Sequence, residues 1–164
     1  MIFVTVGTQL PFERLIQSMD EWTANNSGIE VFAQVGETQY QVKHMATQEN
    51  LSPKEYQEKF NAASIVVSHV GMGTIISGLS IGKPMVLMPR QASLGEHRND
   101  HQLATARKFE TFSLIDVAHS SEELFTCLDA CLTVKKTYKR EDLNVSPSLK
   151  KCLTQFLNEV KDGV

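Results

Sequence analysis

A glycine-rich loop follows an apolar run in the middle of the chain, and its residue types suit phosphate binding. The run, residues 65–67, is short and β-branched, as in strands buried on both faces of a parallel sheet, and residues 69–74 read HVGMGT. Glycines lack a Cβ, so the backbone can turn tightly and approach a ligand. A loop that leads into a helix also points free N–H groups and the positive end of the helix dipole at one place. We therefore predict that a diphosphate binds to His69, Gly71, Met72, Gly73 and Thr74.

Two residues of this loop have alternative roles. His69 could be a buried structural histidine, because a lone histidine at the end of a strand often is. The sequence Gly-x-Gly-Thr that follows it favours a phosphate contact instead. Thr74 could cap the helix through its hydroxyl, a role that is compatible with reaching a phosphate oxygen.

A second polar loop follows the next apolar run, residues 85–88. If a right-handed crossover joins these two parallel strands, both loops lie at the same edge of the sheet and face one crevice. Residues 90–102 read RQASLGEHRNDHQ, a concentration of groups that suits the hydroxyls of a sugar. Arg90 could bind a diphosphate or pair with an acid, while Asn99 and Gln102 could bind sugar or ribose or cap the following helix.

The spacing of His97 and His101 raises the possibility of a metal site, which we reject as the main interpretation. The two histidines are four residues apart, with acidic neighbours. The metalloprotease pattern needs a glutamate directly after the first histidine, whereas Arg98 stands there, and a cation beside a metal ion is unfavourable. We predict no metal.

The order of apolar and polar segments predicts the fold. Gly7 and Thr8 end a first strand over residues 2–6; they are a turn by default, but at this edge of the sheet they could approach the diphosphate. Further strands are expected over 30–35, 41–46, 65–67, 85–88 and 112–117, with helices between all but the first two of these. Ser52 followed by Pro53 and Glu55 is a strong helix start. The alternation predicts an α/β fold with a doubly wound, mainly parallel, Rossmann-like sheet.

Composition limits the function classes. The chain has 164 residues, 41% hydrophobic and 21% charged, which suits one globular domain over residues 1–164 with a helical segment from about residue 146. A net charge of -3 gives no reason to expect a nucleic-acid partner. Three cysteines suit a reducing compartment, and no apolar run approaches the ~20 residues of a membrane span. We expect a cytoplasmic protein.

Three motifs in order resemble those of a known family. The loop HVGMGT at 69–74 resembles the diphosphate loop of GT-B nucleotide-sugar glycosyltransferases, where plant members read His-Cys-Gly-Trp-Asn-Ser. The segments FVTVGT at 3–8 and GEHRNDHQ at 95–102 sharpen the match. Together they resemble the small catalytic subunits of two-component bacterial polysaccharide glycosyltransferases, a group related to the C-terminal domain of glycosyltransferase family 28. The likeness extends from residue 1 to about residue 109.

This resemblance implies a function and a set of contacts. It implies a GT-B C-terminal half that binds a UDP-sugar and, as an inverting hexosyltransferase, adds a hexose-type sugar to a lipid-linked intermediate of exopolysaccharide or capsule synthesis. No cofactor is implied beyond the UDP-sugar substrate. The expected diphosphate contacts are Gly7, Thr8, His69, Gly71, Met72, Gly73, Thr74 and Arg90. The expected sugar or ribose contacts are Glu96, His97, Asn99 and Gln102; Glu96-His97 stands where many relatives have Asp-Gln.

The resemblance also implies a partner. A membrane-associated subunit would bind the lipid-linked acceptor and hold this chain at the inner face of the membrane. No general base is assigned, and the partner could carry it. Two other functions stay open at this point: a non-catalytic regulatory module that binds UDP-sugars, and a nucleotide-sugar epimerase.

Overall fold

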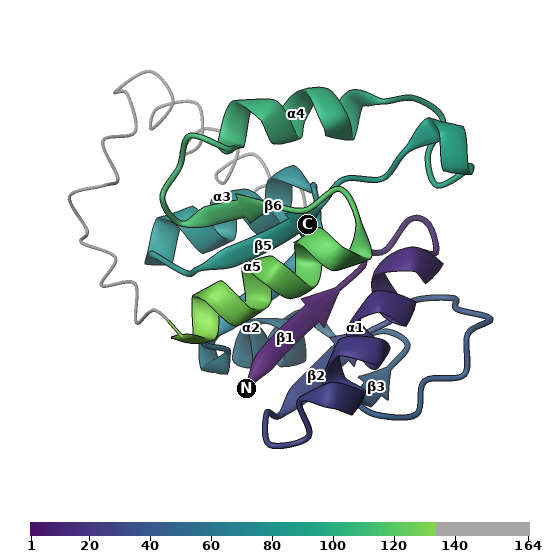
Figure 1. Ribbon diagram of the computed structural model, residues 1–164, viewed down its shortest axis with the longest axis vertical. Coiled ribbons are helices and arrows are strands. Elements are labelled where there is room, and N and C mark those ends of the chain that lie inside the picture. Colours follow the sequence, from purple (N-terminus) through teal and green to yellow (C-terminus); the bar gives the residue numbers. More distant parts are fainter. Residues whose placement is uncertain (134–164) are drawn as a thin grey trace.

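Helices separate most of the consecutive strands in the computed structural model, which describes residues 1–133; β3 follows β2 without one (Figure 1). The terminal helix expected from about residue 146 lies outside this range. The strands are β1 (Ile2–Thr5), β2 (Val31–Gln34), β3 (Ala46–Gln48), β4 (Ile65–His69), β5 (Met85–Met88) and β6 (Ile115–Val117). The helices are α1 (Glu13–Asn25), α2 (Pro53–Ala62), α3 (Met72–Ile81), α4 (His101–Phe109) and α5 (Ser121–Thr133), with a short 3-10 helix, η1, at Ala92–Leu94.

The strands form one sheet in the order β3-β2-β1-β4-β5-β6, and all neighbours pair in parallel. Strand β1 lies in the middle, where Phe3 pairs with Phe32 on one side and Val66 on the other. The order reverses between β1 and β4, so the chain winds outward in both directions from this pair. The predicted doubly wound, parallel α/β fold is confirmed. Its loops after β1, β4 and β5 meet at one edge of the sheet, as parallel strands require.

Alternate strand residues enter two separate apolar cores, one on each face of the sheet. On one face, Val4 and Val67 pack with Leu15 of α1 and Leu124 of α5. Residues Phe3, Val66 and Leu87 of β1, β4 and β5 point the other way, into the core that α2, α3 and α4 complete. Both faces are therefore buried, which explains why the central strands are continuous apolar runs rather than alternating ones.

The third strand does not lie where the sequence predicts it. A strand is expected over residues 41–46, but β3 occupies Ala46–Gln48. The reason is Asp20 of α1, which is 1% exposed and accepts hydrogen bonds from the backbone N–H groups of Lys43 and His44 and from the Tyr40 hydroxyl. Because the N–H groups of Lys43 and His44 donate to Asp20, they are not available to pair with a neighbouring strand.

Two helix starts differ in how they are capped. The predicted capping box of α2 is confirmed: Ser52 Oγ accepts from the Glu55 N–H at 3.3 Å, and the Glu55 carboxylate accepts from the Ser52 N–H at 2.9 Å. Helix α3 begins at Met72 with Gly71 as its N-cap, so Thr74 lies within the first turn and is not the cap. Among the helices of residues 1–133, none is both long and apolar enough to cross a bilayer.

Candidate functional site

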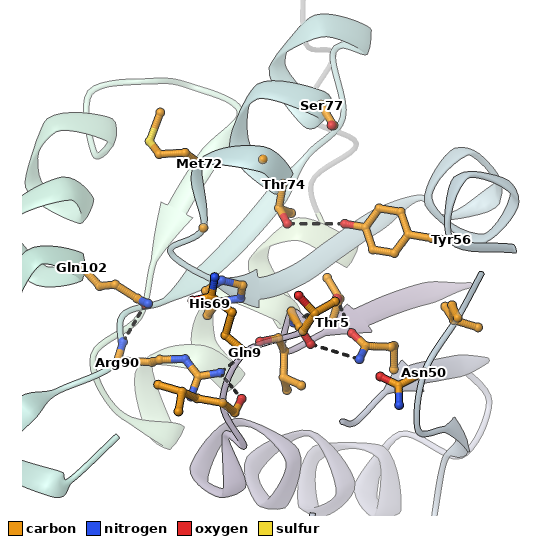
Figure 2. A pocket seen from close by; sticks show the side chains of 18 of the residues that line it. Thr5, Gln9, Asn50, Tyr56, His69, Met72, Thr74, Ser77, Arg90 and Gln102 are labelled. Atoms are coloured by element: carbon orange, nitrogen blue, oxygen red, sulfur yellow. Dashed lines mark hydrogen bonds between the residues drawn. The ribbon is translucent and has the colours of Figure 1, made fainter. Parts of the chain in front are cut away.

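A cavity of about 600 Å³ opens at the edge where the loops after β1, β4 and β5 meet (Figure 2). This volume is in the range of small-molecule sites. Every residue predicted to contact a diphosphate lines it, as do two of those predicted to contact sugar or ribose. These lining residues are Gly7, Thr8, His69, Gly71, Met72, Gly73, Thr74, Arg90, His97 and Gln102. The structure therefore gathers three segments that are far apart in the sequence, although their contacts with a ligand stay predictions.

The start of α3 provides free backbone donors at this cavity. Gly71 is the N-cap, and no side chain caps the helix. The first hydrogen bond of the helix runs from the Ile75 N–H to the Gly71 carbonyl at 3.1 Å. The N–H groups of Met72, Gly73 and Thr74 therefore have no acceptor within the helix. A Cβ added at Gly73 would meet no atom within 4 Å. The space beside Gly73 is therefore open for an anion bound to these N–H groups.

His69 is packed between two glycines. A Cβ at Gly7 would lie 2.7 Å from His69 Cε1, and one at Gly71 would overlap His69 Nε2. Burial, and to a lesser extent the positive charge of Arg90, lower the pKa of His69 from 6.5 to about 4. The imidazole is therefore neutral at pH 7. Its ring also hydrogen-bonds to the backbone of Thr5, and it adds no positive charge to the site.

The loop after β1 is held by a small polar network. Gly7 has φ of 78°, a left-handed conformation that favours glycine. Its N–H donates to Thr5 Oγ1 at 3.3 Å, and its carbonyl accepts from Gln34 Nε2 at 3.1 Å. Thr5 in turn donates to Gln34 Oε1 at 2.8 Å. Gln34 thus fixes the turn that presents Thr8 to the cavity.

Arg90 lines the cavity, but its guanidinium is engaged with the backbone. It is 2% exposed, and Nη2 donates to the carbonyls of Val6 at 3.0 Å and Leu10 at 2.7 Å, while Nη1 donates to that of Pro11. Burial lowers its pKa to about 10, so it stays charged at neutral pH. The sequence allowed a diphosphate contact or an ion pair with an acid. The structure adds a third role, which is to hold the loop after β1.

The remaining residues of the second loop fall into two groups. Gln102 bridges the loops after β4 and β5, because its Oε1 accepts from the Val70 N–H at 3.2 Å and the Arg90 N–H at 3.1 Å. Figure 2 shows the second of these bonds. His97 lines the cavity. Asn99 is not among the residues that line the cavity. Its Oδ1 accepts from the N–H of His101, the first residue of α4, at 3.3 Å.

Glu96 is also outside the cavity lining. Both of its carboxylate oxygens accept from Arg14 of α1, at 2.7 Å from Nε and 2.8 Å from Nη2. A contact between Glu96 and a donor sugar, implied by the resemblance, stays a prediction and would require this ion pair to open or rearrange.

Several lining residues were not predicted. Asn50 and Leu51 follow β3 after Glu49. The expected strand ended too early, so the sequence did not predict that they lie at the same edge of the sheet. The apolar spacing of α2 predicts that Tyr56 faces inward, but its hydroxyl lies 3.4 Å from Thr74 Oγ1 at the cavity (Figure 2). Ser77 stands one helical turn after Gly73. Its position at the cavity follows only once α3 is known to begin at Met72.

The parallel sheet, the glycine loop and the free start of α3 define the class of nucleotide-binding α/β domains that form one half of GT-B glycosyltransferases. Residues 1–156 match the glycosyltransferase family 28 C-terminal domain, and the chain belongs to this family. The resemblance inferred from the three motifs is thereby confirmed.

Individual relatives agree with this assignment. The UDP-N-acetylglucosamine transferase subunit ALG13 of Kluyveromyces lactis is 30% identical over 87 residues, which are 49% of this chain and 42% of that protein. The chain thus aligns with less than half of this relative's length. An NMR structure of ALG13 has a TM-score of 0.63 at 19% identity, covering 93% of this chain and 94% of that one. Os79 of O. sativa in complex with UDP has a TM-score of 0.62 at 16% identity, covering 96% and 40%. These two structures show the shared fold.

Proposed function

We propose that this chain is the donor-binding catalytic subunit of a UDP-sugar-dependent glycosyltransferase that acts on a lipid-linked acceptor. The observation that carries the proposal is the open start of α3, where free N–H groups face a cavity between three loops. The family assignment supports it, because the matching family is a domain of glycosyltransferases. The expected contacts to the diphosphate are those of the glycine loop and of Gly7 and Thr8.

The proposed chemistry is the departure of UDP from the anomeric carbon as the acceptor hydroxyl attacks. Negative charge develops on the leaving diphosphate, and preorganised N–H groups at the helix start stabilise it. Because His69 is neutral at pH 7 and Arg90 is engaged with carbonyls, we assign this stabilisation mainly to backbone donors. We propose inversion at the anomeric carbon and no cofactor besides the donor. The general base stays unassigned.

The sugar is proposed as a class. The resemblance to polysaccharide transferases favours a hexose, for assembly of exopolysaccharide or capsule. The name of the Kluyveromyces relative, a UDP-N-acetylglucosamine transferase subunit, favours an N-acetylhexosamine as a second candidate. Hydroxyl and amide groups at the cavity are compatible with either sugar.

We also propose a membrane-associated partner that supplies the acceptor site. The name of the Kluyveromyces relative, a transferase subunit, supports a complex of more than one chain. A partner would place the acceptor opposite the donor cavity and hold the complex at the cytoplasmic face of the membrane.

Transfer from radiolabelled donors tests this proposal. The chain would be incubated with UDP-glucose, UDP-galactose, UDP-glucuronate or UDP-GlcNAc and extracted lipid acceptor, with and without a co-expressed candidate partner. We expect transfer of one sugar to lipid, and only when the partner is present. Binding of UDP-sugars without turnover in either condition would favour a regulatory module. Conversion of the donor without an acceptor would favour an epimerase.

A further inference from the structure

Two arginines reach in opposite directions between the loop after β5 and the start of α1. Arg90, directly after β5, donates to carbonyls at Val6, Leu10 and Pro11 in the loop after β1. Arg14, on α1, reaches back and donates through Nη2 to the Pro89 carbonyl at 2.9 Å and through Nη1 to the His119 carbonyl at 3.0 Å. The two loops are therefore tied to each other from both sides.

Glu96 adds an ion pair with Arg14 to these contacts, and we call Arg14, Glu96, Arg90 and the carbonyls that they bind the tie. The ion pair is bidentate, at 2.7 and 2.8 Å, and the side chains are only 20% and 12% exposed. Glu96 Oε2 also accepts from the Gln91 N–H at 2.9 Å, which closes the turn over residues 91–96. Bidentate arginine–carboxylate pairs fix orientation as well as distance. The turn is thus held in one position against α1.

A buried aromatic ring connects the two guanidinium groups. Phe12 is 1% exposed, and its ring centroid lies 4.5 Å from Arg90 Cζ and 5.4 Å from Arg14 Cζ. Such cation–ring contacts are favourable, more so where water is excluded. A shift of Arg14 would therefore displace Phe12 and, through Phe12, Arg90.

The tie extends to the cavity, although Arg14 and Glu96 do not line it. Arg90 holds the carbonyls on both sides of Gly7 and Thr8, and Gly7 packs on His69 of the glycine loop. From these contacts we propose that Arg14 and Glu96 are positioning residues of the donor site, which set the first loop against the glycine loop. This inference rests on the proposed binding of a nucleotide diphosphate there.

The proposal makes a distinctive prediction about ligands. A positioning pair acts on the diphosphate loops, which UDP and a UDP-sugar share, so its loss weakens both by the same factor. A direct contact between Glu96 and the donor sugar would instead weaken the UDP-sugar more. Because the two residues act as one unit, the double variant should bind no worse than either single variant.

The test is calorimetric titration with UDP and with the UDP-sugar that the wild-type protein binds best. The variants are Arg14→Gln, Glu96→Gln, the double variant and Arg14→Lys, with thermal unfolding of each. The matched controls are Arg107→Gln and Glu58→Gln, which change exposed residues far from the tie. We expect the affinity for both ligands to fall about five- to tenfold in the first three variants. The fall should be smaller for Arg14→Lys, which keeps the charge but loses the planar guanidinium that binds both carboxylate oxygens.

Three results would overturn the proposal. Affinities within twofold of wild type in folded variants with lowered Tm would make the pair purely structural. A loss confined to the UDP-sugar would place Glu96 in the sugar pocket. Absence of UDP binding to the wild-type protein itself would refute the proposed donor site, and this inference with it.

Discussion

The glycine loop after β4 and the long loop after β5 share one edge of the sheet but are held in different ways. The glycine loop is short, turns at its own glycines and continues directly into α3, with added support from Gln102, which accepts from the Val70 N–H. The loop after β5 is fixed by residues distant in sequence: Arg14 lies 82 positions from Glu96, and Arg90 lies 80 positions from Leu10. The first loop should therefore be sensitive to the space beside its backbone, and the second to the loss of single side chains.

The largest expected effect is at Gly73. In Gly73→Val, the branched side chain would fill the open space beside the first turn of α3, and UDP affinity should fall at least about 100-fold. Stability should change by no more than about 1 kcal/mol, because no neighbour is displaced. Calorimetry and thermal unfolding measure the two quantities. Gly28→Val is the matched control, since a Cβ at Gly28 also meets nothing within 4 Å. Unchanged UDP affinity in folded Gly73→Val protein would refute the loop assignment.

Arg90 should show the opposite balance, with a large loss of stability. Arg90→Met leaves the carbonyls of Val6, Leu10 and Pro11 without their donor, which should cost about 2–4 kcal/mol of unfolding free energy. UDP affinity should fall about tenfold through displacement of the first loop. Arg90→Lys should recover only part of the stability, because an ammonium cannot reach carbonyls in several directions at once. Wild-type stability in Arg90→Met, measured by denaturant unfolding, would contradict this account of the second loop.

A smaller effect is expected from pH. The pKa of His69 is lowered to about 4 in the folded state, so between this value and 6.5 the unfolded chain binds more protons. The free energy of unfolding therefore falls as pH drops from about 6.5 toward 4, and His69 has no effect on its pH dependence above about pH 6.5. The lowered pKa values of Glu55 and Glu122 act below 4.5, outside the upper part of this window. NMR titration of the His69 ring should give a midpoint near 4, whereas one near 6.5 would show that the imidazole is not held between the glycines.

The smallest effect is expected at the start of α2, away from the two loops. Ser52→Ala removes the capping-box hydroxyl and should cost about 1 kcal/mol of unfolding free energy. UDP affinity should stay within twofold of wild type. Thr126→Ala is a suitable control, because its hydroxyl bonds only within an exposed turn of α5. A clear loss of UDP affinity in Ser52→Ala would mean that the cap of α2 sets the position of Tyr56 at the cavity.

Features with local physical causes were predictable from the sequence. The capping box at Ser52 and the strand Met85–Met88 depend on neighbouring residues, and both are where the sequence predicts them. Strand β3 was misplaced because Asp20, more than 20 positions away, takes up the N–H groups of Lys43 and His44. Arg14 was missed for the same reason. Nothing near Arg14 in the sequence indicates that its partner is Glu96.

The most direct test of the central claim is an amide NMR titration of the full chain with UDP. If the start of α3 holds the diphosphate, the N–H signals of Met72, Gly73 and Thr74 should show the largest saturable shifts, followed by Gly7 and Thr8. The same titration with uridine, which lacks the phosphates, should leave the α3 signals nearly unchanged. Saturable UDP binding without shifts at these amides, or no binding at millimolar UDP, would contradict the account.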